Sequence, residues 1–154
     1  PGVFTHGDLT SRTASGGFII HGRSDATLNV GGVRIGTGEV YASLEHVPEV
    51  VDALAFAQVW QDDTRMVLLV VLASGAELDG DMRDRIRRVL RERGSPRHVP
   101  AVIARVDDLP RTLTGKLAEI AVANIVNDRP VRNRDALANP DTLDVIAALE
   151  ALRV

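Results

Sequence analysis

The chain has 154 residues, a formal net charge of −3, 45% hydrophobic residues and 25% charged residues. This length and composition are typical of one folded domain with some length left for a tail, and they exclude general disorder. Because the chain has no cysteine, disulfides, thiolate metal sites and cysteine nucleophiles are excluded. Without an excess of positive charge, neither nucleic acid nor an anionic membrane is expected as a partner.

Signals for export or membrane insertion are missing. The longest apolar run, 66–73, has the length of a strand and is far shorter than the roughly 20 residues of a membrane span. The first residues lack the charged, apolar and small-residue succession of a signal peptide. We therefore expect a cytoplasmic protein with no membrane partner.

The basic residues are strongly biased toward arginine. Seventeen of the eighteen are arginine, and Lys116 is the only lysine. An ammonium is a compact point charge, whereas a guanidinium is a planar fork. A lysine kept against such a bias is a candidate for a role that arginine does not fill, and chance survival of one exposed lysine is the alternative.

The first third of the chain is predicted to form short strands. Residues 18–20 are an apolar run of strand character. Residues 26–30 and 33–35 are two further β-prone runs, separated by the pair Gly31-Gly32. Two strands joined by a two-residue glycine loop indicate a tight hairpin.

A helix and a second hairpin are predicted next. The helix begins with Thr37 as its N-cap, ends before Pro48 and has apolar positions at Val40, Leu44 and Val47. A strand over 51–60, a polar turn over 61–64 and a strand over 65–73 follow. The second of these strands is apolar without alternation, which predicts a central strand covered on both faces.

The remaining chain is predicted to add three helices and one strand. An amphipathic helix that stops at Gly94 has apolar positions at Met82, Ile86, Val89 and Leu90. Residues 101–106 form a third core strand. The next helix has apolar positions at Leu117, Ile120, Ala121 and Ile125. A last helix, with Asn139 as N-cap and Pro140 at its first position, has an apolar stripe of Val145, Ile146, Leu149 and Leu152.

This order of elements indicates an α+β domain. We expect a small mixed sheet of about three core strands plus an N-terminal hairpin, flanked by helices. The four histidines show no metal-ligand spacing, so no metal site is predicted. The pair Gly115-Lys116 is not part of a Walker phosphate loop, because Pro110 and Leu117 stand where that motif requires Gly and Ser or Thr.

Three segments in this order carry a resemblance to a known family. They are His6-Gly7-Asp8, the stretch from Gly22-Arg23-Ser24-Asp25 to Gly32-Val33-Arg34-Ile35, and Pro110-Arg111-Thr112-Leu113-Thr114-Gly115-Lys116. Across residues 4–126 the chain resembles the C-terminal signature motifs of the adenylate-forming superfamily. The sequence of residues 27–39 is most similar to that of short-chain acyl-CoA synthetases. The tail around 139–144 resembles that of the members that activate acetoacetate.

The resemblance implies a role for each matching residue. Lys116 would be catalytic, reaching the carboxylate and the α-phosphate during adenylation. Asp8 and Arg23 would bind the nucleotide at its ribose, and Arg34 is counted with them as nucleotide-binding. Asp25 would be the hinge about which the small C-terminal domain rotates.

A second set of roles concerns thioester formation. Gly32, together with Arg34, would belong to the face presented in that state, and Gly32 and Arg91 would contact CoA. ATP with Mg²⁺ and CoA are the implied cofactors and substrates, along with a short-chain carboxylate. The other implied partner is a large N-terminal domain of the same polypeptide, which would bind most of the ATP and its metal.

The resemblance also implies domain boundaries. Residues 1–24, which begin without Met, would be the end of the large domain, and residues 25–154 would be the C-terminal lid with a helical tail. In this interpretation the chain is a fragment of an acid–thiol ligase and is inactive alone. The alternative is a freestanding module of the lid fold that binds acyl-CoA or a protein partner without catalysis.

Overall fold

The computed structural model describes residues 8–23 and 27–153. Its strands are β1 (Asp8–Arg12), β2 (Phe18–Arg23), β3 (Thr27–Val30), β4 (Val33–Gly36), β5 (Val50–Trp60), β6 (Asp63–Leu72) and β7 (Val102–Arg105). Its α-helices are α1 (Thr37–Leu44), α2 (Gly80–Arg93), α3 (Glu119–Val126) and α4 (Thr142–Ala147), and three 3₁₀ turns are η1 (Pro96–His98), η2 (Arg134–Ala136) and η3 (Glu150–Leu152).

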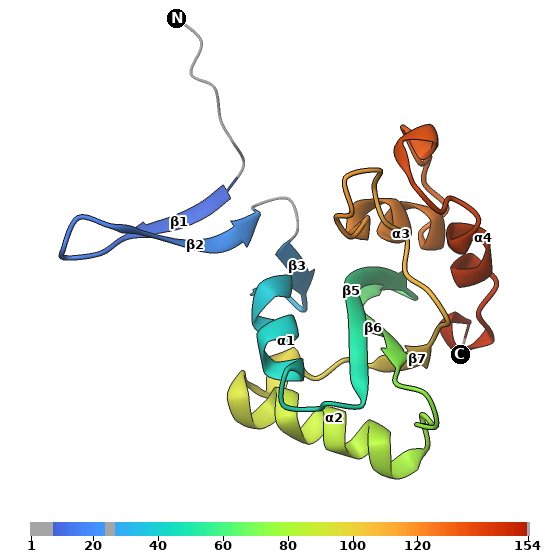
Figure 1. Cartoon of the computed structure of the whole chain (residues 1–154), viewed down its shortest axis with the longest axis horizontal. Helices are drawn as coiled ribbons and strands as arrows, with labels where there is room; N and C mark the ends of the chain where they lie inside the picture. The colour runs from blue at the N-terminus through green and yellow to red at the C-terminus, as the bar shows by residue number, and fades with distance from the viewer. Residues whose placement is uncertain (1–7, 24–26, 154) are drawn as a thin grey trace, which may run out of the picture.

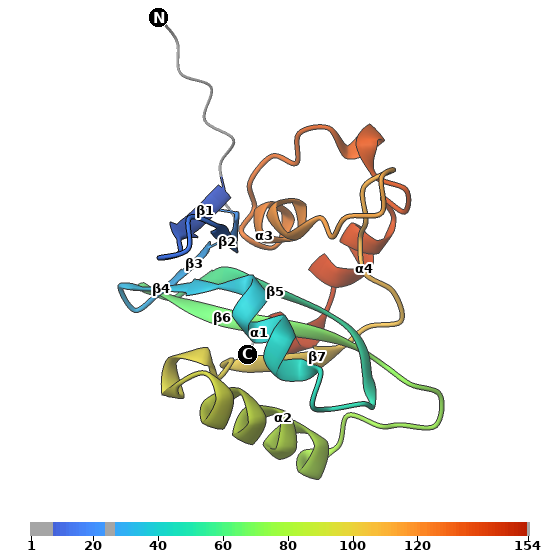
Figure 2. The same cartoon turned by 60° about the vertical axis from the view of Figure 1, so that its left-hand side comes forward.

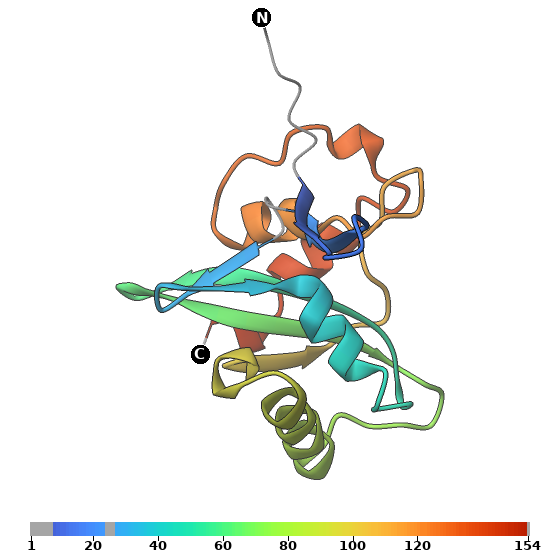
Figure 3. The same cartoon turned by 90° about the vertical axis from the view of Figure 1, so that its left-hand side faces the viewer.

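A three-stranded mixed sheet lies at the centre of the fold (Figure 1). β6 pairs with β5 in antiparallel and with β7 in parallel orientation. The central position predicted for the apolar strand is therefore confirmed. Helices α1 and α2 cover one face of the sheet and α3 and α4 the other, as Figures 2 and 3 show. The expected α+β class, a small mixed sheet flanked by helices, is confirmed.

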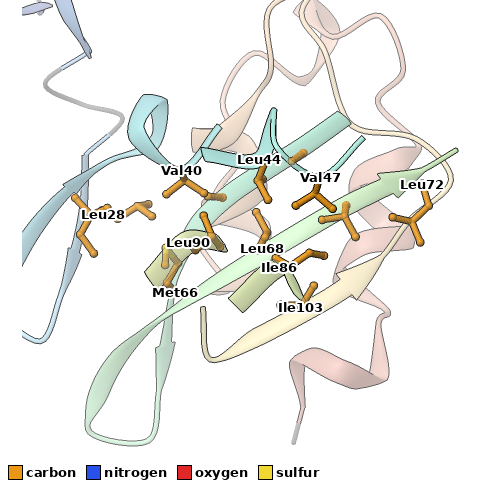
Figure 4. Close-up of a cluster of buried hydrophobic side chains, with 14 residues drawn as sticks. Leu28, Val40, Leu44, Val47, Met66, Leu68, Leu72, Ile86, Leu90 and Ile103 are labelled. Carbon is orange, nitrogen blue, oxygen red and sulfur yellow. The ribbon is translucent and has the colours of Figure 1, made fainter. Parts of the chain in front are cut away.

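The two faces of the sheet belong to two separate cores because side chains alternate along each strand. In β6, Met66 and Leu68 point into the core under α1 and α2, whereas Val67 and Leu69 point into the core under α3 and α4. Figure 4 shows the first core, where Leu44 of α1 and Ile86 of α2 approach the sheet. Every one of these residues except Leu44 is at most 1% exposed.

The second core contains the C-terminal tail, and its helices differ from the predicted stripes. In α4 the buried positions are Leu143 and Ile146, while Val145 is 62% exposed. In α3 the buried position is Val122, while Ile120 is 50% exposed. Both helices are short, with eight and six residues, so the apolar spacing alone does not determine which face is buried.

Two hairpins precede the central sheet. β1 pairs with β2, and β3 pairs with β4. Gly31 and Gly32 connect β3 and β4 with φ of 54° and 77°, the left-handed values that a two-residue type I′ turn requires and that glycine adopts without strain. The predicted glycine hairpin is therefore confirmed.

Two predicted boundaries were wrong in detail. The N-cap of α1 is Gly36, and the predicted cap Thr37 is instead the buried first residue of the helix. The turn between β5 and β6 has only two residues, because the pairing continues to Trp60 and Asp63. The predicted end of α2 at Gly94 is confirmed, although this glycine has φ of −106° and is not left-handed.

Candidate functional site

The only lysine lies on a tight hairpin loop that follows β7. We call residues 107–118 the Lys116 loop. Within it the Thr112 N–H donates to the Lys116 carbonyl at 2.8 Å and the Gly115 N–H donates to the Thr112 carbonyl at 2.8 Å. Gly115 has φ of 82°, the left-handed residue that closes a three-residue hairpin loop. The Thr112 hydroxyl also accepts the Lys116 N–H at 3.1 Å. The backbone of Lys116 is thus fixed on both sides.

An arginine holds this hairpin against the sheet. The Arg111 guanidinium donates through Nη1 to the Gly115 carbonyl at 2.8 Å. Through Nη2 it forms an ion pair with the Asp52 carboxylate on β5. One planar fork therefore links the base of the hairpin, its left-handed glycine and the sheet.

Residues 136–139, which run on from the end of η2, hold the opposite side of the loop. We call them the tail segment. The Leu113 N–H donates to the Ala136 carbonyl at 3.0 Å, and the Ala138 N–H donates to the Arg111 carbonyl at 2.8 Å. The Asn139 side chain accepts the Arg111 N–H at 2.8 Å. The Lys116 loop is consequently held from both flanks.

The Lys116 side chain lines an open groove of about 680 Å³ between the loop, α3 and residues 130–137. Lys116 is exposed. Among the described residues, no carboxylate forms an ion pair with its ammonium. An exposed cation on a fixed backbone is suited to bind an anionic group from outside the domain.

The groove begins where α3 is anchored to the first core. The Tyr41 hydroxyl of α1 donates to the Glu119 carboxylate at the start of α3. The same oxygen accepts the Ala55 N–H of β5 at 3.1 Å. Burial, and then the Glu119 carboxylate, raise the pKa of Tyr41 above its ordinary value, so this hydroxyl stays protonated and continues to donate.

The residues predicted to contact CoA lie away from Lys116. In Figures 2 and 3 the β3–β4 turn and the end of α2 lie toward the left of the sheet, and the loop between β7 and α3 lies toward the right. Arg34 of β4 and Arg91 of α2 are both exposed. A Cβ on Gly32 would meet no atom within 4 Å, so the surface above this turn is open. The two groups of predicted residues therefore occupy separate parts of the surface.

The two predicted ribose contacts are brought together. Asp8 and Arg23 stand directly opposite each other in the register of β1 and β2. The predicted hinge, Asp25, and the motif residues His6 and Gly7 lie outside the described part of the chain.

Two further properties concern metals and membranes. Among residues 8–23 and 27–153, no group of three or more His, Cys, Asp or Glu side chains is arranged to hold a metal ion. No helix formed by those residues has the length and apolar character needed to cross a bilayer.

Comparison with known proteins gives close relatives over nearly the whole chain. Acetoacetyl-coenzyme A synthetase of Rhizobium meliloti is 53% identical over 151 residues, which are 98% of this chain and 23% of that protein. Acetoacetyl-CoA synthetase of Mus musculus is 41% identical over 99% of this chain and 23% of its own length. The chain thus spans about a quarter of the curated relatives that it matches. No family model matches it.

Solved structures agree with these relatives. Acetoacetyl-CoA synthetase from Streptomyces lividans superposes with a TM-score of 0.81 and 38% identity, over 96% of this chain and 22% of its own. An anthranilate CoA ligase in complex with anthranoyl-AMP superposes with a TM-score of 0.65 and 26% identity, over 73% of this chain and 22% of its own. The chain matches one part of the adenylate-forming acyl-CoA synthetases. The family resemblance drawn from its motifs is confirmed.

The sequence did not predict the contacts that Asp52, Arg111 and Asn139 make at this site. Arg111 is inside the recognised motif, but nothing in the motif indicates its ion pair with Asp52. Asn139 was interpreted as a helix cap, whereas its side chain bonds to the Lys116 loop. An asparagine before a proline has the same local pattern in both cases, and only the tertiary fold distinguishes them.

Proposed function

We propose that the chain is the C-terminal lid of an AMP-forming acetoacetyl-CoA synthetase, with residues 1–24 ending the large domain and residues 25–154 forming the lid. The polypeptide would activate acetoacetate with ATP and transfer the acyl group to CoA. Relatives of that name cover 98% of this chain at 53% identity while being much longer, which supports a part of such an enzyme. Alone, the chain would have no ligase activity.

Lys116 would serve the first half-reaction. A carboxylate oxygen attacks the α-phosphorus of ATP, the new P–O bond forms, and the bond to the leaving pyrophosphate breaks. Negative charge on the phosphoryl oxygens increases in the transition state, and a positioned ammonium stabilises it without a covalent intermediate. The observation that carries this proposal is the exposed Lys116 ammonium, without an ion-pair partner in the described residues, on a loop fixed at both flanks.

The surface around the β3–β4 turn would serve the second half-reaction. There the CoA thiol attacks the acyl carbon of the adenylate, the thioester C–S bond forms and AMP leaves. Gly32, Arg34 and Arg91 would lie on the face presented to CoA, while Asp8 and Arg23 would remain at the ribose. Since Lys116 and Arg34 lie on separate parts of the surface, a rotation of the lid about Asp25 would exchange the groups at the active site.

The metal that accompanies ATP is assigned to no residue of this chain. The described residues contain no cluster of His, Cys, Asp or Glu suited to a metal ion. Mg²⁺ would be held by the ATP phosphates and mainly by residues of the large domain.

The test compares two variants of the longer polypeptide in the two half-reactions. Lys116→Ala should lower acetoacetate-dependent ATP–pyrophosphate exchange by about 10²- to 10³-fold, the loss typical for one charge-stabilising donor. It should leave the conversion of supplied acyl-adenylate to acyl-CoA largely unchanged. Arg34→Ala should give the opposite pattern, and Val145→Ala, whose side chain on α4 is 62% exposed, should alter neither. Exchange at the wild-type rate in Lys116→Ala would overturn the proposal.

A further inference from the structure

The Asn139 side chain connects the tail segment to the start of the Lys116 loop through three hydrogen bonds. Its Oδ1 accepts the Arg111 N–H at 2.8 Å. Its Nδ2 donates to the Leu109 carbonyl at 2.9 Å and to the Asp108 carboxylate at 2.6 Å. One amide therefore binds the backbone of Leu109 and Arg111 and the Asp108 side chain, directly before the hairpin that carries Lys116.

The backbone of Asn139 is itself held by the second core. The Asn139 carbonyl accepts the Thr142 hydroxyl at 2.7 Å and the Thr142 N–H at 3.2 Å. Thr142 is the first residue of α4, whose Leu143 and Ile146 are at most 1% exposed. Asn139 thus connects the loop to a well-packed helix.

The remaining hydrogen bonds between the tail segment and the loop are made by the main chain. They are the bonds from Leu113 N–H to Ala136 and from Ala138 N–H to Arg111, with a single β-bridge between Thr112 and Leu137. Leu137 also packs with Leu109 in the second core. The Arg111 guanidinium holds the base of the hairpin from the side of the sheet, and the three side-chain bonds of Asn139 hold it from the side of the tail segment.

We propose that Asn139 is a positioning residue for Lys116, which it serves through the backbone of Leu109 and Arg111. This inference rests on the proposed function. A misplacement of about 1 Å in a group that stabilises a transition state can cost roughly 10²-fold in rate. Loss of the Asn139 amide should therefore impair adenylation, where Lys116 acts, and spare thioester formation, where it does not.

The chain offers a matched control in a second asparagine. Asn127 also makes three bonds, accepting the Val59 N–H at 2.6 Å and donating to the Ala57 and Ala123 carbonyls at 3.0 and 2.6 Å. These bonds join α3 to β5 and do not involve the Lys116 loop. Asn127→Ala removes an equivalent amide and reports the effect of lost stability alone.

The experiment uses the longer polypeptide and both half-reactions. Asn139→Ala should lower ATP–pyrophosphate exchange by about 10- to 100-fold and change thioester formation from supplied acyl-adenylate by less than about threefold. Asn127→Ala should change both half-reactions to the same small extent. The inference would be overturned if Asn139→Ala lost the same activity in both half-reactions. It would also be overturned if Asn127→Ala lost exchange and thioester formation in the same proportions as Asn139→Ala.

A second variant adds a pH profile that a purely structural role would not produce. Asn139→Asp keeps the acceptor but places a carboxylate beside that of Asp108, and two carboxylates so close share a proton as the pH falls. That proton restores one donated bond. The exchange rate of Asn139→Asp, relative to wild type, should therefore rise toward acid pH. A pH-independent ratio would count against the inference, and this test remains if Asn139→Ala fails to fold.

Failure of the inference is distinguishable from failure of the proposed function. If Lys116→Ala lowers exchange as expected and Asn139→Ala leaves it at the wild-type rate, the proposed function is supported and the positioning role is wrong. If Lys116→Ala leaves exchange intact, the function falls, and the positioning role is judged by hydrogen exchange of the Arg111 and Leu113 amides. These amides should exchange about tenfold faster in Asn139→Ala than in Asn127→Ala; equal exchange would overturn the role.

Discussion

Arg111 and Asp52 form an ion pair that joins the Lys116 loop to strand β5. The side chains are 37% and 30% exposed, so water screens part of their attraction. The same guanidinium donates to the Gly115 carbonyl at 2.8 Å. Its two contacts need the geometry of a planar fork, which an ammonium does not have.

We expect Arg111→Lys to lose one of these two contacts although the charge is kept. In a double-mutant cycle with Asp52→Asn, the coupling in the free energy of unfolding should be about 0.5–1 kcal/mol, the range of a partly exposed pair. The cycle is measured by urea unfolding of the chain. Additive effects of the two substitutions would show that the pair contributes no stability.

Gly94 is required by a close neighbour. A Cβ at this position would lie 2.6 Å from Cγ of His98. The ring cannot easily move, because its Nδ1 is 3.0 Å from the Ser95 hydroxyl and its Nε2 is 2.8 Å from the Glu39 carboxylate. We expect Gly94→Ala to lower the free energy of unfolding by about 1–3 kcal/mol, the usual cost of overpacking.

The control for this prediction lies on the same helix. A Cβ on Gly80 would meet no atom within 4 Å, so Gly80→Ala should be neutral or stabilise the chain by up to about 1 kcal/mol. Adding His98→Ala to Gly94→Ala should recover much of the lost stability, because it removes the overlapping ring. If the double variant were less stable than Gly94→Ala by the full cost of His98→Ala, steric overlap would not be the cause.

Local patterns predicted the elements whose form depends on nearby residues. The pair Gly31-Gly32 predicted a hairpin because its conformation is determined by the turn itself. The apolar run 66–73 predicted a central strand because burial on both faces is visible in its composition. Lys116 was identified from its motif together with its rarity.

Features that depend on tertiary contacts could not be predicted in the same way. Nothing near Gly94 in the sequence indicates that a ring four residues later approaches it. The interpretation of Asn139 as a cap was wrong, because bonds to residues about 30 positions earlier replace the cap. In the last predicted stripe Ile146 and Leu152 are buried as expected and Val145 is exposed. The stripe does not follow one helix, because α4 ends at Ala147 and Leu152 lies in η3.

The end of the chain is anchored by one arginine. Arg65 stacks over the Trp60 ring at 3.9 Å from its centroid. It donates through Nη2 to the Leu152 carbonyl at 3.0 Å and through Nε to Oε1 of Gln58 at 2.9 Å. Gln58, which is 5% exposed, donates to the same Leu152 carbonyl at 2.9 Å. Burial lowers the pKa of Arg65, yet a guanidinium stays charged at neutral pH.

We expect Arg65→Ala to lower the free energy of unfolding by about 1–3 kcal/mol through lost hydrogen bonds and cation–π contact. It should also accelerate hydrogen exchange of the amides in η3. Arg87→Ala is the matched control, because Arg87 forms only a surface pair with Asp84 at 3.2 Å, worth at most about 0.5 kcal/mol. Equal losses in the two variants would mean that the Arg65 contacts add nothing beyond a surface pair.

Tyr41 should make the chain unstable in alkali. It is the only tyrosine, and burial and then the Glu119 carboxylate raise its pKa in the folded chain. In the unfolded chain it titrates near its ordinary pKa of about 10. The stability from keeping Tyr41 neutral is therefore fully present below about pH 10 and is lost as the pH rises further, by about 1.4 kcal/mol per pH unit for one proton.

This prediction has two measurements. In unfolding experiments at increasing pH, the wild type should lose stability above about pH 10, and Tyr41→Phe should lack that part of the slope while being less stable at neutral pH, because the Ala55 N–H loses its acceptor. Tyrosinate absorbance reports the same group directly, since no other tyrosine contributes. It should appear together with unfolding. Tyrosinate formed while the far-ultraviolet circular dichroism is still native would contradict the raised pKa.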